Sequence, residues 1–172
     1  MPLYVVGLGS NLGDRRAAIE AALEHLEGGV PGCRIEARSR LWETVPVGGP
    51  DGQPLYLNAA VRLRTREEPA VLLQRCHAIE QALGRNRSGE ARWGPRTLDI
   101  DLLWWDGHPI RTASVTLPHP RLLERAFAVV PACEVLDHPP ETLRRAAARA
   151  GEPGRAVSWS GRRDVERSAD RR

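Results

Sequence analysis

The chain contains stretches in which apolar residues recur at every second position, typical of strands, and stretches with the three-to-four-residue spacing of helices. Residues 3–8 predict a first strand, and Asp14 is placed to cap a helix that runs to about Leu26. Looser alternation over 33–44 and clear alternation over 56–64 predict a second and a third strand. The first part of the chain therefore has the order β-α-β-β.

A second helix is predicted from Glu67-Glu68-Pro69 to about Leu83, because acidic residues and proline favour the first turn of a helix. The helical spacing predicts which apolar side chains of this helix enter the core: Val71, Leu72, Cys76, Ile79 and Leu83. The pattern then predicts four further elements, namely a strand over 97–105, a returning hairpin strand over 115–117, a helix containing Arg125 and Phe127, and a short helix over 142–150.

The order β-α-β-β-α-β with short connections is typical of a ferredoxin-like α+β sandwich, an antiparallel sheet with two helices on one face. We therefore expect this fold, with an extra hairpin strand, C-terminal helices, and the face without helices left open for a ligand. The 172 residues, 41% of them hydrophobic, suffice for one domain, which we expect over 1–150. Beyond Gly151 there is no periodicity, so we expect disorder in most of the Arg-rich tail over 151–172.

Composition narrows the function classes. The formal charge of +3, from 25 basic and 22 acidic residues, is too balanced to indicate a nucleic-acid partner. The absence of lysine from the sequence excludes a Walker-type phosphate loop and Schiff-base catalysis. Three cysteines without a CxxC pair indicate a reducing compartment and argue against a zinc site. The sequence has neither a basic leader nor an apolar run of membrane-spanning length, so we expect a cytoplasmic monomer without a membrane or nucleic-acid partner.

The strongest chemical signal is the pair Asp99 and Asp101 on the strand over 97–105. Alternation places both carboxylates on one face, with Cα atoms about 6–7 Å apart, which suits one divalent cation or an adjacent pair. A Gly- and Pro-rich segment just upstream carries a guanidinium cluster and an aromatic side chain that could stack: Arg85, Arg87, Arg92, Trp93 and Arg96. On its own, an Asp-x-Asp pair is usually a solvated face. Together with the arginines it predicts a site for a nucleoside triphosphate with magnesium.

Three weaker signals accompany this pair. Tyr56 and Asn58 share one face of their strand and could hold a flat heterocycle by stacking and hydrogen bonds, although an edge strand would explain them equally well. His77 and Glu80 lie three residues apart near the end of the second helix, beside the arginine-rich segment. The glycine-rich turn over 7–13 suggests a dinucleotide fold, but its spacing is one residue too long. We interpret its glycines and Asn11 as permitting a sharp turn.

Four motifs resemble the 6-hydroxymethyl-7,8-dihydropterin pyrophosphokinase family of folate biosynthesis. They are Gly9-Ser-Asn-Leu-Gly-Asp14, Tyr56-Leu-Asn-Ala-Ala60, Arg92-Trp-Gly-Pro-Arg-Thr-Leu-Asp-Ile-Asp101 and Leu117-Pro-His119. The resemblance covers about residues 3–145 and is most specific in the central decapeptide. It implies a three-layer ferredoxin-like fold and the transfer of pyrophosphate from ATP to the hydroxymethyl group of the pterin, with release of AMP.

The resemblance also implies roles for individual residues. Two magnesium ions that arrive with ATP would be held by Asp99 and Asp101, which with Arg85, Arg92 and Arg96 form the catalytic group. The nucleotide would be contacted by a larger set: His77, Glu80, Arg85, Arg87, Trp93, Arg96, Leu102, Thr116, His119 and Arg125. The pterin would be stacked and hydrogen-bonded by a second set, in which Val47 acts through its backbone: Thr44, Val47, Tyr56, Asn58, Trp93 and Phe127.

Two departures from the family pattern and two alternatives remain. Pro120 follows the histidine where some members carry tyrosine, and the tail beyond Ala150 matches no part of the family. A non-catalytic ferredoxin-like binding module would have no need of the paired aspartates beside the arginines. A dinucleotide-dependent reductase would bind NAD(P)H without magnesium.

Overall fold

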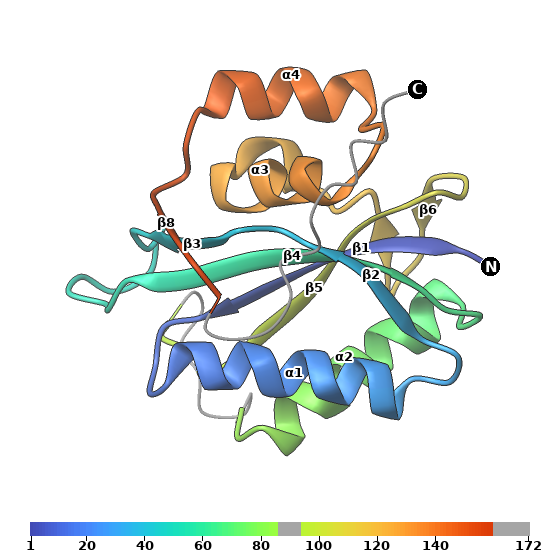
Figure 1. The fold of residues 1–172 in the computed structure, drawn as a ribbon, viewed down its shortest axis with the longest axis horizontal. Helices are drawn as coiled ribbons and strands as arrows, with labels where there is room; N and C mark the ends of the chain where they lie inside the picture. The colour runs from blue at the N-terminus through green and yellow to red at the C-terminus, as the bar shows by residue number, and fades with distance from the viewer. Residues whose placement is uncertain (86–93, 160–172) are drawn as a thin grey trace, which may run out of the picture.

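The computed structural model describes residues 1–85 and 94–159, and its centre is an antiparallel sheet between two layers of helices (Figure 1). Its three longest strands are β1 (Leu3–Ser10), β4 (Tyr56–Arg64) and β5 (Asp99–Trp105), with β1 between the other two. The strand order is β5-β1-β4-β3-β8, with β2 also paired to β4. This is the predicted α+β arrangement, because β1 pairs antiparallel with both β4, which precedes the second helix, and β5, which follows it.

Helices α1 (Arg15–Gly29) and α2 (Pro69–Ala82) cover one face of the sheet, the lower one in Figure 1. The Asp14 carboxylate caps α1 by accepting a hydrogen bond from the Ala17 amide. Between these helices and the sheet lies the main apolar core, which contains Ile19, Leu23, Leu72, Leu98 and Ile100. The prediction that Val71 enters this core is wrong, since its side chain is 39% exposed. Within the described residues no helix is both long and apolar enough to cross a membrane.

Helix α3 (Ala126–Val135) packs on the other face of the sheet, and α4 (Glu141–Ala150) packs on α3, above it in Figure 1. They form a second apolar cluster with the sheet, in which Val5, Ala60 and Leu103 contribute from the strands. The expectation that this face is wholly open is therefore wrong. The site described below lies on this face, beside the beginning of α3.

Two strand predictions differ from the structure. The single strand expected over 33–44 is divided into β2 (Arg34–Arg38) and β3 (Leu41–Thr44), because the Arg40 amide donates to the carboxylate of Glu134 on α3 instead of continuing the strand ladder. The returning strand does not pair with β5. Instead β6 (Ile110–Arg111) and β7 (Thr116–Leu117) form a separate two-stranded sheet, which a short 3₁₀ turn follows at Leu122–Glu124.

The segment after α4 is more ordered than expected. Strand β8 (Arg155–Val157) pairs antiparallel with β3, and the indole Nε1 of Trp159 donates to the Ser39 carbonyl at 2.9 Å. Val157 and Trp159 also pack against the main core. The prediction of disorder is therefore wrong for residues 151–159, whereas residues 160–172 lie outside the described part of the chain.

Candidate active site

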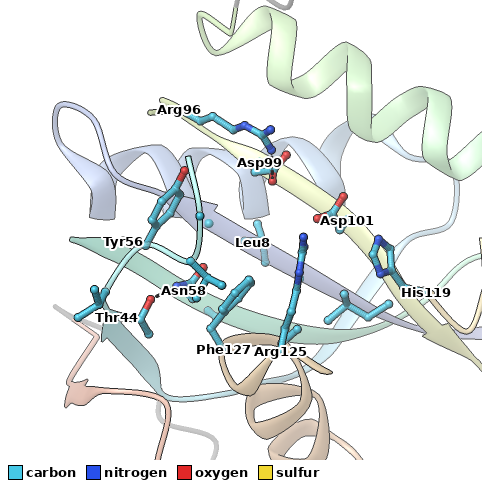
Figure 2. A pocket seen from close by; sticks show the side chains of 18 residues that line it. Leu8, Thr44, Tyr56, Asn58, Arg96, Asp99, Asp101, His119, Arg125 and Phe127 are labelled. Carbon is cyan, nitrogen blue, oxygen red and sulfur yellow. Dashed lines mark hydrogen bonds and ion pairs between the residues drawn. The ribbon is translucent and has the colours of Figure 1, made fainter. Parts of the chain in front are cut away.

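A cleft opens over the sheet beside the beginning of α3. Its floor is the outward face of β1, β4 and β5, and its sides come from the β3–β4 loop (residues 45–55), the end of the segment that precedes β5, and the beginning of α3. Figure 2 shows two groups of side chains in it. Aromatic and amide groups gather near β4, while charged groups gather along β5 and the approach to α3.

Two glycines of β1 give the cleft its flat floor. A Cβ atom added at Gly9 would lie 2.8 Å from the Asn58 Oδ1, and one added at Gly7 would lie 3.0 Å from the Leu103 Cδ1. Any larger residue would therefore push into the side chains beside the cleft. These glycines therefore do more than permit the predicted turn, because glycine at alternate positions within a strand is a signal for close approach of another group.

The carboxylates of Asp99 and Asp101 both line the cleft, as their alternation with buried Leu98 and Ile100 predicts. Both oxygens of Asp99 are engaged by guanidinium groups: Arg85 Nη1 lies 2.5 Å from Oδ1, and Arg96 Nη1 lies 2.7 Å from Oδ2. The structure thus places two cations against one acidic side chain. A group of this kind can exchange charge partners when a polyanion enters the cleft.

Glu80 and His77 belong to α2, the helix that covers the opposite face of the sheet. The fully buried Glu80 carboxylate accepts from Arg85 Nη1 at 2.8 Å and from the Ile100 amide at 2.7 Å. Glu80 therefore lies behind Arg85 and orients it. The predicted direct contact of Glu80 with a nucleotide does not fit this position, because the carboxylate is completely buried behind Arg85.

Burial and the neighbouring charge of Asp99 raise the pKa of Asp101 to about 7, with a further contribution from Glu80. The cations Arg125 and Arg96 oppose this rise in pKa. A desolvated carboxyl group beside a second carboxylate is destabilised when ionised, and a bound cation would relieve that destabilisation. Among the described residues no group of three or more His, Cys, Asp or Glu side chains converges, so a cation here would take its other ligands from substrate or water.

His119 is held at the cleft by its own backbone and ring. Its amide donates to the Leu103 carbonyl at 2.8 Å, and its Nδ1 accepts from the Arg121 amide at 3.1 Å. Burial and the charge of Arg125 lower the pKa of the imidazole, which favours the neutral ring. Because Nδ1 is an acceptor, the neutral ring carries its proton on Nε2 and presents a hydrogen-bond donor.

The uncharged half of the cleft brings together Tyr56, Asn58, Thr44 and Phe127 (Figure 2). The Asn58 Nδ2 donates to the Thr44 Oγ1 at 2.7 Å, and both residues are buried, so the orientation of the amide is fixed. The Tyr56 hydroxyl donates to the Gly94 carbonyl at 3.2 Å. Two aromatic rings and a fixed amide on adjacent walls are suited to a flat heteroaromatic ligand.

The structure thus gathers most of the predicted site in one cleft. Arg125, which precedes α3, also belongs to the cleft lining, and burial together with Arg121 lowers the pKa of its guanidinium. Val47 lies on the β3–β4 loop with 68% of its side chain exposed. Leu102 faces the main core and Thr116 lies on β7, so their predicted contacts would be made by backbone. Arg87, Arg92 and Trp93 lie outside the described residues.

Residues 5–137 match the family model of 7,8-dihydro-6-hydroxymethylpterin-pyrophosphokinase (HPPK). The chain belongs to this family. It is 45% identical over 152 residues to the 2-amino-4-hydroxy-6-hydroxymethyldihydropteridine pyrophosphokinase of Methylorubrum extorquens AM1, which covers 87% of this chain and 94% of that HPPK. The Bacillus subtilis strain 168 protein of the same name is 41% identical over 132 residues, covering 76% of this chain and 75% of the relative.

Solved structures support the HPPK fold. A crystal structure of HPPK-DHPS in complex with substrates matches 87% of this chain with a TM-score of 0.64 at 13% sequence identity. A Plasmodium falciparum HPPK-DHPS structure with SDX-DHP matches 87% with a TM-score of 0.59 at 15% identity. The chain spans 45% and 43% of those two longer proteins, so it corresponds to one part of each.

Proposed function

We propose that this chain transfers pyrophosphate from ATP to the hydroxymethyl group of 6-hydroxymethyl-7,8-dihydropterin, a reaction of folate biosynthesis that yields the pterin diphosphate and AMP. One observation carries the proposal beyond family membership. A pocket for a flat heterocycle adjoins two carboxylates and several cations in a single cleft, so a pterin and a triphosphate can lie side by side. In the reaction the α–β phosphoanhydride bond breaks, the β-phosphorus bonds to the hydroxymethyl oxygen, and the hydroxyl proton is released.

The uncharged half of the cleft binds the pterin. Tyr56 and Phe127 supply the ring contacts, and the fixed Asn58 amide with Thr44 supplies hydrogen bonds in the plane of the heterocycle. The Val47 backbone completes this recognition from the β3–β4 loop. Because the amide is already oriented by Thr44, little side-chain freedom is lost on binding.

Asp99 and Asp101 fit the two magnesium ions that ATP brings. Both carboxylates face the cleft, oxygen is the ligand that magnesium prefers, and the raised pKa of Asp101 indicates a group that a nearby cation would stabilise in its ionised form. When bound, magnesium neutralises phosphate charge and orients the hydroxyl of the pterin. Two carboxylates leave most coordination positions to phosphate oxygens and water, in agreement with ions that arrive with the nucleotide.

The cationic side chains bind the phosphates. Arg96 and Arg85 stand beside Asp99, Arg125 lines the cleft, and the neutral His119 presents its Nε2 proton. Phosphoryl transfer depends chiefly on positioning and charge neutralisation, so a strong general base is not required. In this proposal the nucleotide is also contacted by Arg87, Arg92 and Trp93, with His77 and the backbone near Leu102 and Thr116 at the nucleoside.

Incubation of the protein with ATP, MgCl₂ and 6-hydroxymethyl-7,8-dihydropterin tests the proposal directly. We expect AMP and the pterin diphosphate in equal amounts, and no AMP when the pterin or the magnesium is omitted. Separating the products by anion-exchange chromatography distinguishes AMP from the ADP that simple ATP hydrolysis would give. A protein that binds pterin but releases no AMP would be the non-catalytic module, and oxidation of NADPH without magnesium would indicate a reductase.

A further inference from the structure

Asn11 lies in the turn between β1 and α1, and its side chain is 1% exposed. The side-chain Oδ1 of Asn11 accepts from the backbone N–H of Arg96 at 2.7 Å, and the backbone N–H of Asn11 donates to the Arg96 carbonyl at 3.0 Å. This pair of bonds fixes the backbone of Arg96 on both sides. The Arg96 guanidinium in turn reaches Asp99 at 2.7 Å, so Asn11 determines where this cation enters the cleft.

The side-chain nitrogen of Asn11 holds the β3–β4 loop. The Asn11 Nδ2 donates to the Pro54 carbonyl at 3.2 Å and lies 3.4 Å from the Gln53 Oε1. Gln53 in turn links this end of the loop to its middle, because its Nε2 donates to the carbonyls of Gly48 and Pro50, each at 3.2 Å. The loop is therefore attached to Asn11 near its end and cross-braced by Gln53 over its middle.

These two attachments belong to opposite halves of the cleft. Arg96 is part of the charged half, whereas the loop contributes Val45, Val47 and Gly48 to the wall of the uncharged half. A simple turn would need only a backbone that can bend. A fully buried amide with its acceptor directed to one half and its donor to the other meets a more specific geometric requirement, since no hydroxyl or carboxylate side chain offers both groups at this reach.

We propose that Asn11 is a positioning residue that holds the phosphate-binding Arg96 and the pterin-binding β3–β4 loop in register with each other. The inference rests on the proposed function for the identity of the two substrates, and on the hydrogen bonds of Asn11 for the linkage. Asn11 itself contacts neither substrate in this scheme. It acts through Arg96 on the nucleotide side and through Gln53 and Pro54 on the pterin side.

Two substitutions of Asn11 separate the role of its side-chain acceptor, Oδ1, from that of its side-chain donor, Nδ2. Asn11→Asp keeps the acceptor for the Arg96 amide but places an oxygen against the Pro54 carbonyl, so the loop is released. We expect the KM for the pterin to rise about 10-fold, the order expected for one lost buried hydrogen bond, with kcat and the KM for ATP within about 2-fold of wild type. Asn11→Ser removes both groups, and we expect kcat to fall about 10-fold in addition. Gln53→Ala, which removes only the brace of the loop, should reproduce part of the pterin effect.

The matched control is Ser10→Ala. Ser10 is adjacent, fully buried, and its hydroxyl has no hydrogen-bond partner in the described part of the chain. We expect this variant to retain the wild-type kcat and both KM values. If Asn11→Asp and Asn11→Ser lose thermal stability but keep both KM values and kcat, Asn11 is only a folding residue and the proposal is overturned. The proposal is also overturned if Asn11→Asp lowers kcat and raises both KM values by the same factor.

Amide hydrogen exchange makes the linkage testable independently of turnover. We expect the Arg96 amide to be protected in wild type and in Asn11→Asp, and to exchange faster in Asn11→Ser, because only serine lacks an acceptor at this reach. Failure of wild type to produce AMP would refute the proposed reaction, not the linkage. Unchanged exchange at Arg96 in Asn11→Ser would refute the linkage even if the enzyme were active.

Discussion

The two faces of the central sheet are built from the same strands but meet different demands. Towards α1 and α2, the strands present Leu8, Ile100 and Leu102 to an apolar core. Towards α3, the neighbouring positions present Gly7, Gly9, Asp99 and Asp101 to a cleft. A single residue step along β1 or β5 therefore separates a side chain that stabilises the fold from one that serves the chemistry, and substitutions on the two faces should have separable effects.

The largest effect is expected on the cleft face. Asp101→Ala and Asp99→Ala should each reduce turnover by about 10³-fold or more, because each removes a carboxylate that faces the triphosphate in the proposed reaction. The midpoint of urea unfolding should remain close to that of wild type for Asp101→Ala. The measurement is AMP formation at saturating substrates, with Ser10→Ala as the control. Turnover by Asp101→Ala at the wild-type rate would contradict the assignment of this face.

Leu98, the residue before Asp99, should show the opposite result, with a loss of stability and little change in substrate binding. Leu98 is fully buried in the core below the sheet, and Leu98→Ala should lower the free energy of unfolding by about 3 kcal/mol. At a temperature where the variant remains folded, we expect both KM values to stay within about 2-fold of wild type. Urea titration and steady-state kinetics on one preparation give both numbers. A large change in KM without a loss of stability would mean that the two faces are not independent.

The third prediction concerns the stability that is lost when the buried Asp101 carboxylate is ionised. The pKa of Asp101 is raised to about 7 in the folded protein, so its carboxyl binds a proton that the unfolded chain releases at lower pH. Its contribution therefore falls as the pH rises from about 4 to about 7, and is lowest above that range. Without divalent cations, Asp101→Asn should be more stable than wild type by about 2 kcal/mol at pH 8. This advantage should vanish near pH 3, as urea titrations in EDTA would show.

The smallest effect is expected at the edge of the sheet, where β3 contacts both α1 and β8. Glu43 on β3 is held by Arg15 of α1 at 2.7 Å and by Arg155 of β8 at 2.8 Å, and their hydrogen bonds lower the pKa of Glu43. Arg155→Ala should raise that pKa while changing stability by less than about 1 kcal/mol, because Arg155 is largely exposed. The difference in stability should disappear in acid once Glu43 is protonated. An NMR titration of the Glu43 carboxyl measures the shift.

Prediction from the sequence succeeds where a local pattern decides the outcome. Alternation correctly separates Asp99 and Asp101 from Leu98 and Ile100, and it predicts the bounds of β4. The family resemblance carried by the four motifs is confirmed by the family model. Both results follow from short-range properties, since strand periodicity and motif spacing are written within ten residues of chain.

The errors concern long-range contacts. Helix α3 is apolar on nearly every side, so its own periodicity does not indicate which layer it joins. Strand β8 has three residues and owes its order to pairing with β3 and to the Trp159 contact, neither of which its composition reveals. The same limit hid the purpose of Asn11, because its partners at Pro54 and Arg96 lie 43 and 85 residues away.

Strand β8 also affects the tendency of this protein to self-associate. The last strand of an open sheet exposes unpaired amide and carbonyl groups that can recruit a strand from a neighbouring molecule. Without β8, β3 would be that last strand. The chain instead returns after α4 and ends the sheet with β8 (Arg155–Val157), whose three residues leave only a short exposed edge. Cleavage near Gly151 would expose the edge of β3, and the shortened molecules would become prone to self-association through it.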